Sequence, residues 1–143
     1  MPELPDVETY RRYLNATALH KAIEAAEVRA ERVLKGVTSS RLERILNGSS
    51  FEKTHRHGKY LFIRLNGNGW LVLHFGMTGF LRYYKQPGKK PSHARVHVRF
   101  SNGYHLSYDC RRRLGEVNLC DDPQRFIREQ ELGPDALAPD LAF

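Results

Sequence analysis

Hydrophobic side chains near the start of the chain recur at intervals of three and four residues. Side chains at those intervals share one face of a helix, so the spacing predicts an amphipathic helix from Pro5 to about His20. The apolar stripe consists of Val7, Tyr10, Leu14 and Ala18. Arg11 and Arg12 fall on the other side, which leaves their charges outside a core.

Two shorter helices are predicted further along the chain. A hydroxyl cap within residues 38–40 and a stop at Asn47-Gly48 bound the first of them. Its inward side chains would be Leu42, Ile45 and Leu46. Pro123 follows Asp122 and starts the second, which is expected to run to about Gln130.

The segment from Ala22 to Leu34 is ambiguous. Its alanine and glutamate favour a helix, whereas its β-branched residues and its place after a long helix favour a strand, which is the prediction adopted here. Gly36 would end the element.

From Ser49 onward, apolar and polar residues alternate with a period of two, which is typical of strands. Seven strands are predicted: Phe51 to Arg56, Tyr60 to Leu65, Trp70 to Phe75, Phe80 to Tyr84, Arg95 to Phe100, Tyr104 to Tyr108 and Glu116 to Leu119. Turn residues separate them, as at His57-Gly58 and Asn102-Gly103. Short strands at this spacing predict a mainly β fold, either a sandwich or a barrel.

The composition adds a charge imbalance to this picture. The 143 residues suffice for one domain with a core, and 41% hydrophobic and 27% charged residues are ordinary values. The net charge of +7 is not ordinary; it is spread along the chain and indicates a basic face for a polyanionic partner, the alternative being a generic basic surface. Cys110 and Cys120 are too few for a zinc site or a disulfide framework. With no apolar run of membrane-spanning length and no signal peptide, a cytoplasmic location is expected.

The first residues offer candidate chemistry. If Met1 is removed, Pro2 becomes a free secondary amine, whose pKa of roughly 8 leaves a usable neutral fraction to attack an electrophilic carbon. Glu3 would hold a carboxyl group nearby for proton transfer. Two alternatives stand beside this interpretation: Pro5 with acidic neighbours is also a good helix start, and the N-terminal-proline tautomerases use such an amine as a base.

Three motifs together resemble one family. Residues 2–8 read Pro-Glu-Leu-Pro-Asp-Val-Glu, residues 58–61 read Gly-Lys-Tyr-Leu, and residues 74–79 read His-Phe-Gly-Met-Thr-Gly. In this order they resemble the N-terminal domain of the formamidopyrimidine-DNA glycosylase and endonuclease VIII family of base-excision repair enzymes, over essentially the whole chain. The resemblance implies a two-layer β-sandwich with an N-terminal helix and one further helix, over residues 1–131. Residues 132–143 would then be a linker toward a helix–two-turn–helix and zinc-finger domain.

The resemblance also implies roles for single residues. Pro2 and Glu3 are the expected nucleophile and acid, and Lys59 is expected to contact a phosphate and assist β-elimination. Met77 would be a wedge in the space left by an everted nucleotide. The remaining expected DNA contacts are His93, Arg112 and Leu114.

The alignment around these arginines has an alternative. A gapless match places Arg112 where the family pairs an arginine with the orphaned base, whereas aligning Asp109 with the family aspartate would give that place to Arg111. Arg112 is the preferred choice. Leu114 stands where the family has phenylalanine, and Asp6 replaces a family glutamate.

The function expected from this resemblance is a bifunctional DNA glycosylase and AP lyase that excises oxidised bases through a Schiff base at Pro2. Its partner would be double-stranded DNA with damaged bases or abasic sites, near the nucleoid, with no protein partner. No cofactor is expected within this chain, since the family zinc finger would lie beyond residue 143. The alternative is a DNA-binding module without turnover.

Overall fold

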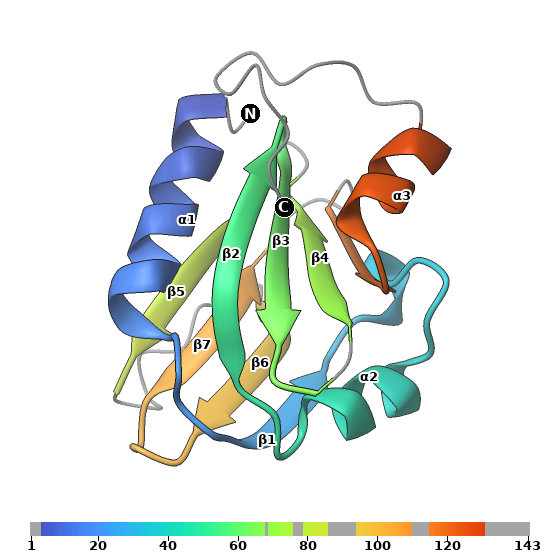
Figure 1. Ribbon diagram of the computed structural model, residues 1–143. Helices are drawn as coiled ribbons and strands as arrows, with labels where there is room; N and C mark the ends of the chain where they lie inside the picture. Colours follow the sequence, from blue (N-terminus) through green and yellow to red (C-terminus); the bar gives the residue numbers. More distant parts are fainter. Residues whose placement is uncertain (1–3, 68, 76–78, 86–93, 110–114, 131–143) are drawn as a thin grey trace.

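The computed structural model describes residues 4–67, 69–75, 79–85, 94–109 and 115–130. In these parts the chain forms eight strands, three α-helices and one 3-10 turn (Figure 1). In order they are α1 (Leu4–Thr17), β1 (Ile23–Val28), η1 (Glu31–Val33), α2 (Ser39–Leu46), β2 (Phe51–His57), β3 (Tyr60–Leu65), β4 (Trp70–His74), β5 (Phe80–Tyr84), β6 (Ala94–Phe100), β7 (His105–Asp109), β8 (Glu116–Cys120) and α3 (Pro123–Glu129).

The strands form two antiparallel four-stranded sheets. One has the order β1-β6-β7-β5 and the other β2-β3-β4-β8. Alternate side chains of both sheets meet in a shared core, so the two-layer β-sandwich is confirmed, and the described strands form two sheets rather than a closed barrel. The predicted N-terminal helix is confirmed as well.

Each helix covers a different part of the sandwich. Helix α1 runs alongside β2 and buries Val7 and Leu14, the expected apolar stripe (Figure 1). Helix α2 packs on β1 and buries Leu42 and Leu46, after Thr38 caps it by accepting a hydrogen bond from the Arg41 amide. Helix α3 packs on the outer side of the second sheet, in a separate cluster of Phe62, Val72, Phe126 and Ile127.

Two predicted boundaries were wrong. Helix α1 ends at Thr17 rather than at His20, because His20 has a φ of 64° and its amide donates to the Phe51 carbonyl. The strand expected over Ala22 to Leu34 ends at Val28. The chain then turns through η1 so that Leu34 bridges to Val117 on β8.

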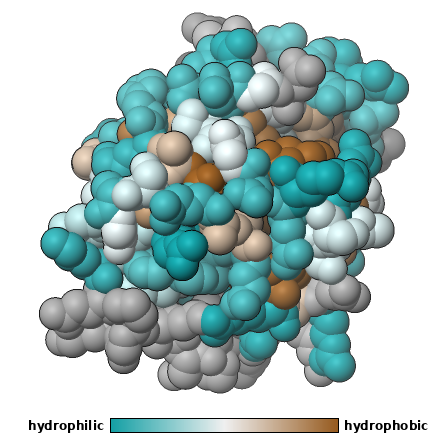
Figure 2. Space-filling model, turned by 90° about the horizontal axis from the view of Figure 1, so that it is seen from below, coloured by the Kyte–Doolittle hydropathy of each residue, from teal (hydrophilic) through white to brown (hydrophobic). Residues whose placement is uncertain are grey.

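The surface away from the β2–β3 hairpin is largely polar. Figure 2 shows mostly hydrophilic residues there, with small hydrophobic areas between them. No helix in the described parts of the chain is long and apolar enough to cross a bilayer. The expected linker, residues 132–143, lies outside the described residues.

Candidate active site

Strand pairing brings the ends of several predicted motif segments to one end of the sandwich. In the sheet β2-β3-β4-β8, Tyr60 pairs with both His57 and His74, and His74 also pairs with Glu116. These residues flank the Gly58-Lys59 hairpin, the segment that holds Met77 and the segment that holds Arg112. The strand ends that flank these three segments, called anchors below, are therefore neighbours in one sheet, at the upper end in Figure 1.

The other sheet contributes its anchors at the same end. Phe80 and Ala94 both pair with Asp109, on the two sides of β7. Phe80 follows the Met77 segment, Ala94 follows His93, and Asp109 precedes the Arg112 segment. The Tyr108 hydroxyl, next to Asp109 on β7, donates to the carbonyl of His74 on β4 at 2.5 Å. This hydrogen bond joins the two sheets at the end where these strand ends lie.

A buried aromatic ring holds the start of the Met77 segment. Phe75 is fully buried, and its ring centroid lies 4.9 Å from that of Tyr10 on α1 and 5.8 Å from that of Tyr108 on β7. The Gly79 amide donates to the Phe75 carbonyl at 2.8 Å. A Cβ at position 79 would lie 2.3 Å from that carbonyl oxygen, so the backbone approach requires glycine.

Of the predicted site residues, the structure describes Lys59. It lies in the turn between β2 and β3, partly exposed, after Gly58, whose φ of 58° suits a tight hairpin. The other expected site residues lie outside the described residues, so their roles stay predictions; they are Pro2, Glu3, Met77, His93, Arg112 and Leu114.

His74 is a neighbour of Lys59 to which the sequence assigned no role. Its ring stacks edge-on against Tyr60, with centroids 4.8 Å apart. Burial lowers the pKa of His74, the Glu116 carboxylate opposes that effect, and the positive charge of Lys59 adds to it. His74 is therefore expected to be neutral near pH 7.

An ionic cluster joins the first turns of α1 to the hairpin. Arg56, near the end of β2, donates from Nε to Glu8 Oε1 at 3.0 Å, and Arg11 and Arg12 also donate to the Glu8 carboxylate. The Glu8 pKa is lowered to about 2, first by the hydrogen bonds from Arg11, then by those from Arg56 and Arg12, while burial opposes them. The sequence suggested only a helix-start role for Glu8, because a partner 48 residues away leaves no local pattern.

This cluster predicts an acid-sensitive contribution to stability. A carboxylate whose folded pKa is lowered stabilises the fold above its unfolded pKa, near 4.5, and that contribution is lost as the pH falls toward 2. The full shift corresponds to about 3 kcal/mol, and solvent screening is expected to reduce it to about 1–2 kcal/mol. Urea unfolding of the parent and Glu8→Gln should therefore differ above about pH 5 and converge as the pH approaches about 2.

Glu129→Gln is the matched control for that measurement. Glu129 is 60% exposed and pairs only along α3 with Arg125 in the contacts that the structure describes. Its substitution should leave the acid dependence of the parent intact. Parallel curves for the parent and Glu8→Gln at all pH values would contradict the role assigned to the Glu8 cluster.

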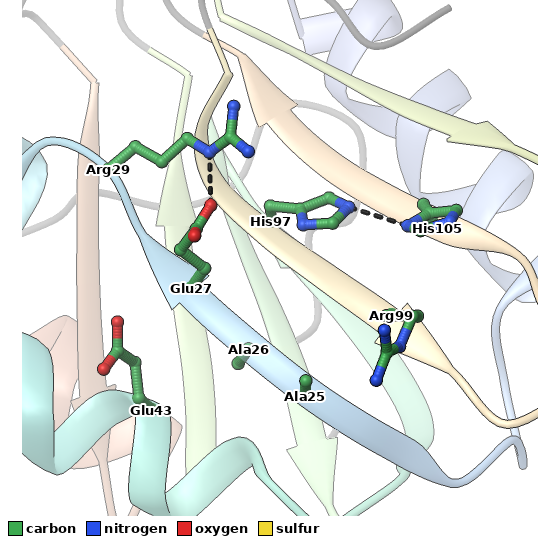
Figure 3. Close-up of a pocket in the computed structure, with 8 residues that line it drawn as sticks. All are labelled: Ala25, Ala26, Glu27, Arg29, Glu43, His97, Arg99 and His105. Carbon is green, nitrogen blue, oxygen red and sulfur yellow. Dashed lines mark hydrogen bonds and ion pairs between the residues drawn. The ribbon is translucent and has the colours of Figure 1, made fainter. Parts of the chain in front are cut away.

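A cavity of about 490 Å³ lies on the outer side of the sheet β1-β6-β7-β5 (Figure 3). His97 Nε2 and His105 Nδ1 are 2.8 Å apart there, and burial lowers the pKa of both rings. Glu27 pairs with Arg29, and Glu43 accepts a hydrogen bond from a backbone amide. Because these polar groups already have hydrogen-bond or ion-pair partners, the cavity is a weaker candidate than the loop-bearing end of the sandwich.

Metal binding has no evident place in the parts of the chain that are described. No group of three or more metal-ligating side chains gathers among those residues. Burial and the nearby Asp121 and Asp122 carboxylates raise the pKa of the Cys120 thiol to about 12, which keeps it protonated.

The described residues form a two-layer β-sandwich with an N-terminal helix, and the strand ends that flank the Lys59, Met77 and Arg112 segments lie together at one end of it. A model of the formamidopyrimidine-DNA glycosylase N-terminal domain matches residues 1–117. The chain belongs to this family.

Curated relatives agree over nearly the whole chain. It is 36% identical to a formamidopyrimidine-DNA glycosylase of Halorhodospira halophila over 96% of this chain, and 35% identical to one of Teredinibacter turnerae over 99% of it. These alignments cover 51% and 52% of the relatives. The chain thus spans about half the length of the curated relatives it matches.

Solved structures show the same fold. A complex of wild-type Lactococcus lactis Fpg (MutM) with DNA containing N7-benzyl-Fapy-dG matches with a TM-score of 0.86 and 27% identity, over 93% of this chain and 49% of that one. A complex of Lactococcus lactis Fpg with DNA containing an abasic site matches with a TM-score of 0.84 and 26% identity, over 92% of this chain and 49% of that one.

Proposed function

We propose that this chain carries the catalytic half of a bifunctional DNA glycosylase and AP lyase that acts on oxidised bases. The observation that carries the proposal is the convergence of the motif anchors at one end of the sandwich, with Lys59 between them. The relatives named above are glycosylases, and two of the matching structures hold DNA with a modified or abasic nucleotide, which supports a damaged duplex as the partner.

The proposed chemistry begins at the N-terminal amine. Pro2 nitrogen attacks C1′ of the deoxyribose, and the bond from C1′ to the base breaks, so the base leaves with the bonding electrons and takes up a proton. Glu3 donates a proton to O4′ as the sugar ring opens, which leaves an iminium between C1′ and Pro2. Loss of a proton from C2′ then breaks the C3′–O bond and cuts the strand on the 3′ side. Water hydrolyses the iminium and frees the amine.

Borohydride trapping on abasic-site duplex tests the proposal directly. Reduction of the iminium would fix protein to DNA as a stable covalent adduct, whereas a DNA-binding module without turnover would bind the duplex and give none. One observation favours the DNA-binding module without turnover: the chain spans about half the length of its curated relatives. The tautomerase alternative accounts for neither the charge of +7 nor the family match.

The protein is expected to bind DNA mainly through phosphates. Each phosphate neutralised by a basic side chain releases counterions, so log K falls with log salt by ~0.9 per contact. With several contacts, the affinity for an undamaged duplex should fall at least about tenfold between about 50 and 200 mM salt. Fluorescence anisotropy at constant pH measures this slope, and a flat response would contradict a basic DNA-binding face.

Residues 1–143 alone are expected to excise damaged bases weakly or undetectably. A single sandwich domain would contact only one side of the duplex. Bending DNA by about 40–90° costs of order 1–6 kcal/mol, and contacts beyond this domain would be needed to offset that cost. Single-turnover release of an oxidised purine should therefore be far slower than with a relative of full length. Equal rates would show that this domain is self-sufficient.

A further inference from the structure

Arg56 connects two elements that the proposed chemistry must hold together. Its Nε donates to Glu8 Oε1 on α1 at 3.0 Å, and one of its terminal nitrogens donates to the Gly58 carbonyl at 3.0 Å. Helix α1 follows the N-terminal residues Pro2 and Glu3, and Gly58 directly precedes Lys59. One guanidinium therefore contacts both the helix that follows Pro2 and Glu3 in sequence and the residue that precedes Lys59.

The burial of Arg56 makes this contact more than a surface ion pair. Only 4% of its side chain is exposed, and Glu8 is 19% exposed. Exposed ion pairs contribute little to structure, whereas a buried guanidinium must have its donors satisfied or pay a large desolvation cost. A guanidinium is also planar with its donors at fixed angles, so satisfying two acceptors at once fixes their relative placement.

We propose that Arg56 is a positioning residue for strand cleavage: by bridging Glu8 and the Gly58 carbonyl, it fixes the Lys59 hairpin relative to the helix that follows the N-terminal amine. This inference rests on the proposed function. It assigns Arg56 no contact with DNA and no proton transfer. Its effect is on the β-elimination step, in which Lys59 is the expected assistant.

The two steps of the reaction separate this role from a general loss of structure. Trapping of the iminium needs the N-terminal amine and bound DNA, whereas strand cleavage also needs the Lys59 side chain in place. A misplacement of about 1 Å in a catalytic group can cost on the order of a hundredfold in rate. Arg56→Met should therefore slow cleavage of abasic-site duplex by about tenfold to a hundredfold while its trapping yield stays close to that of the parent.

Two variants sharpen that comparison. Arg56→Lys keeps the charge but cannot satisfy two acceptors with one planar group, so it should fall between the parent and Arg56→Met. Arg11→Met is the matched control: it removes an arginine that donates twice to Glu8 but leaves the Gly58 carbonyl contact untouched. Equal cleavage rates in Arg11→Met and Arg56→Met, each relative to its trapping yield, would overturn the proposal.

Limited trypsin digestion tests the same inference without any activity. Trypsin cuts after Lys59, and a hairpin that has lost its link to α1 should be cut several-fold faster there, while cutting after Lys53 within β2 stays unchanged. The proposal expects this increase in Arg56→Met and Arg56→Lys but not in Arg11→Met. If the hairpin of Arg56→Lys is cut no faster than that of the parent, the bridge does not position Lys59.

These measurements distinguish the two possible failures. A parent protein that forms no adduct with abasic DNA would overturn the proposed function, whatever trypsin shows. A parent that forms the adduct, together with Arg56 variants that cleave the strand at the parental rate, would overturn the positioning role alone. If Arg56→Met does not fold, Arg56→Lys gives both readouts.

Discussion

A protein that retains Met1 is expected to form no borohydride-stable adduct with abasic-site DNA. With Met1 attached, the Pro2 nitrogen is part of an amide, and its lone pair is delocalised into the carbonyl. Such a nitrogen has negligible nucleophilicity, so no iminium can form. Removal of Met1 should restore the adduct, a change from none to a readily detected amount.

The experiment compares the two forms of one protein. Intact-mass analysis first establishes which terminus each preparation carries, and trapping is then compared at equal protein concentration. DNA affinity is the internal control, because phosphate contacts do not use Pro2 and should be the same in both forms. Pro2→Gly in the processed form should keep some trapping through its primary amine.

The opposite result would name a different nucleophile. An adduct of the Met1-retaining form as abundant as that of the processed form would require another amine. Lys59 is the first candidate, because it lies in the hairpin at the end of the sandwich where the strand ends that flank the Met77 and Arg112 segments also lie. Peptide mapping of the reduced adduct would then locate the modified residue.

The local elements were largely predictable because their causes are local. Of the apolar stripe, Val7, Leu14 and Ala18 are buried as their spacing indicated, and Tyr10 is partly buried. The turn at Asn102-Gly103 has the positive φ that only glycine adopts without strain. The seven strands predicted from Phe51 onward each lie within about a residue of those observed. Boundaries failed where a distant contact decided them, as at His20, whose amide pairs with Phe51.

The arrangement of the site was much less predictable. No local pattern shows that β7 lies between β5 and β6, and therefore that Asp109 has Phe80 and Ala94 on its two sides. The pairing of Glu8 with Arg56 has the same origin, because sequence spacing reports neighbours along a helix or strand and not across elements. The family resemblance identified the candidate residues, and the strand pairing shows that the strand ends flanking their segments lie at one end of the sandwich.

Phe75→Ala is expected to destabilise the protein by about 3–5 kcal/mol, the cost of a cavity in place of a fully buried ring. The same ring holds the start of the Met77 segment against Tyr10 and Tyr108. Its loss should therefore reduce affinity for abasic DNA beyond what lower stability explains. Urea unfolding measures the first effect, and binding measured at matched folded fraction isolates the second.

Phe51→Ala supplies the matched control. Phe51 is equally buried but lies at the start of β2, at the opposite end of that strand from the Lys59 hairpin, where it pairs with Leu65 and contacts Phe100. It should lose a similar amount of stability, again about 3–5 kcal/mol, and keep its DNA affinity per folded molecule. Phe75→Leu, a smaller change, should show the binding defect while remaining well folded. If Phe75→Leu and Phe51→Ala bind DNA equally well per folded molecule, Phe75 is a core residue only, and the Met77 segment is held in place by other contacts.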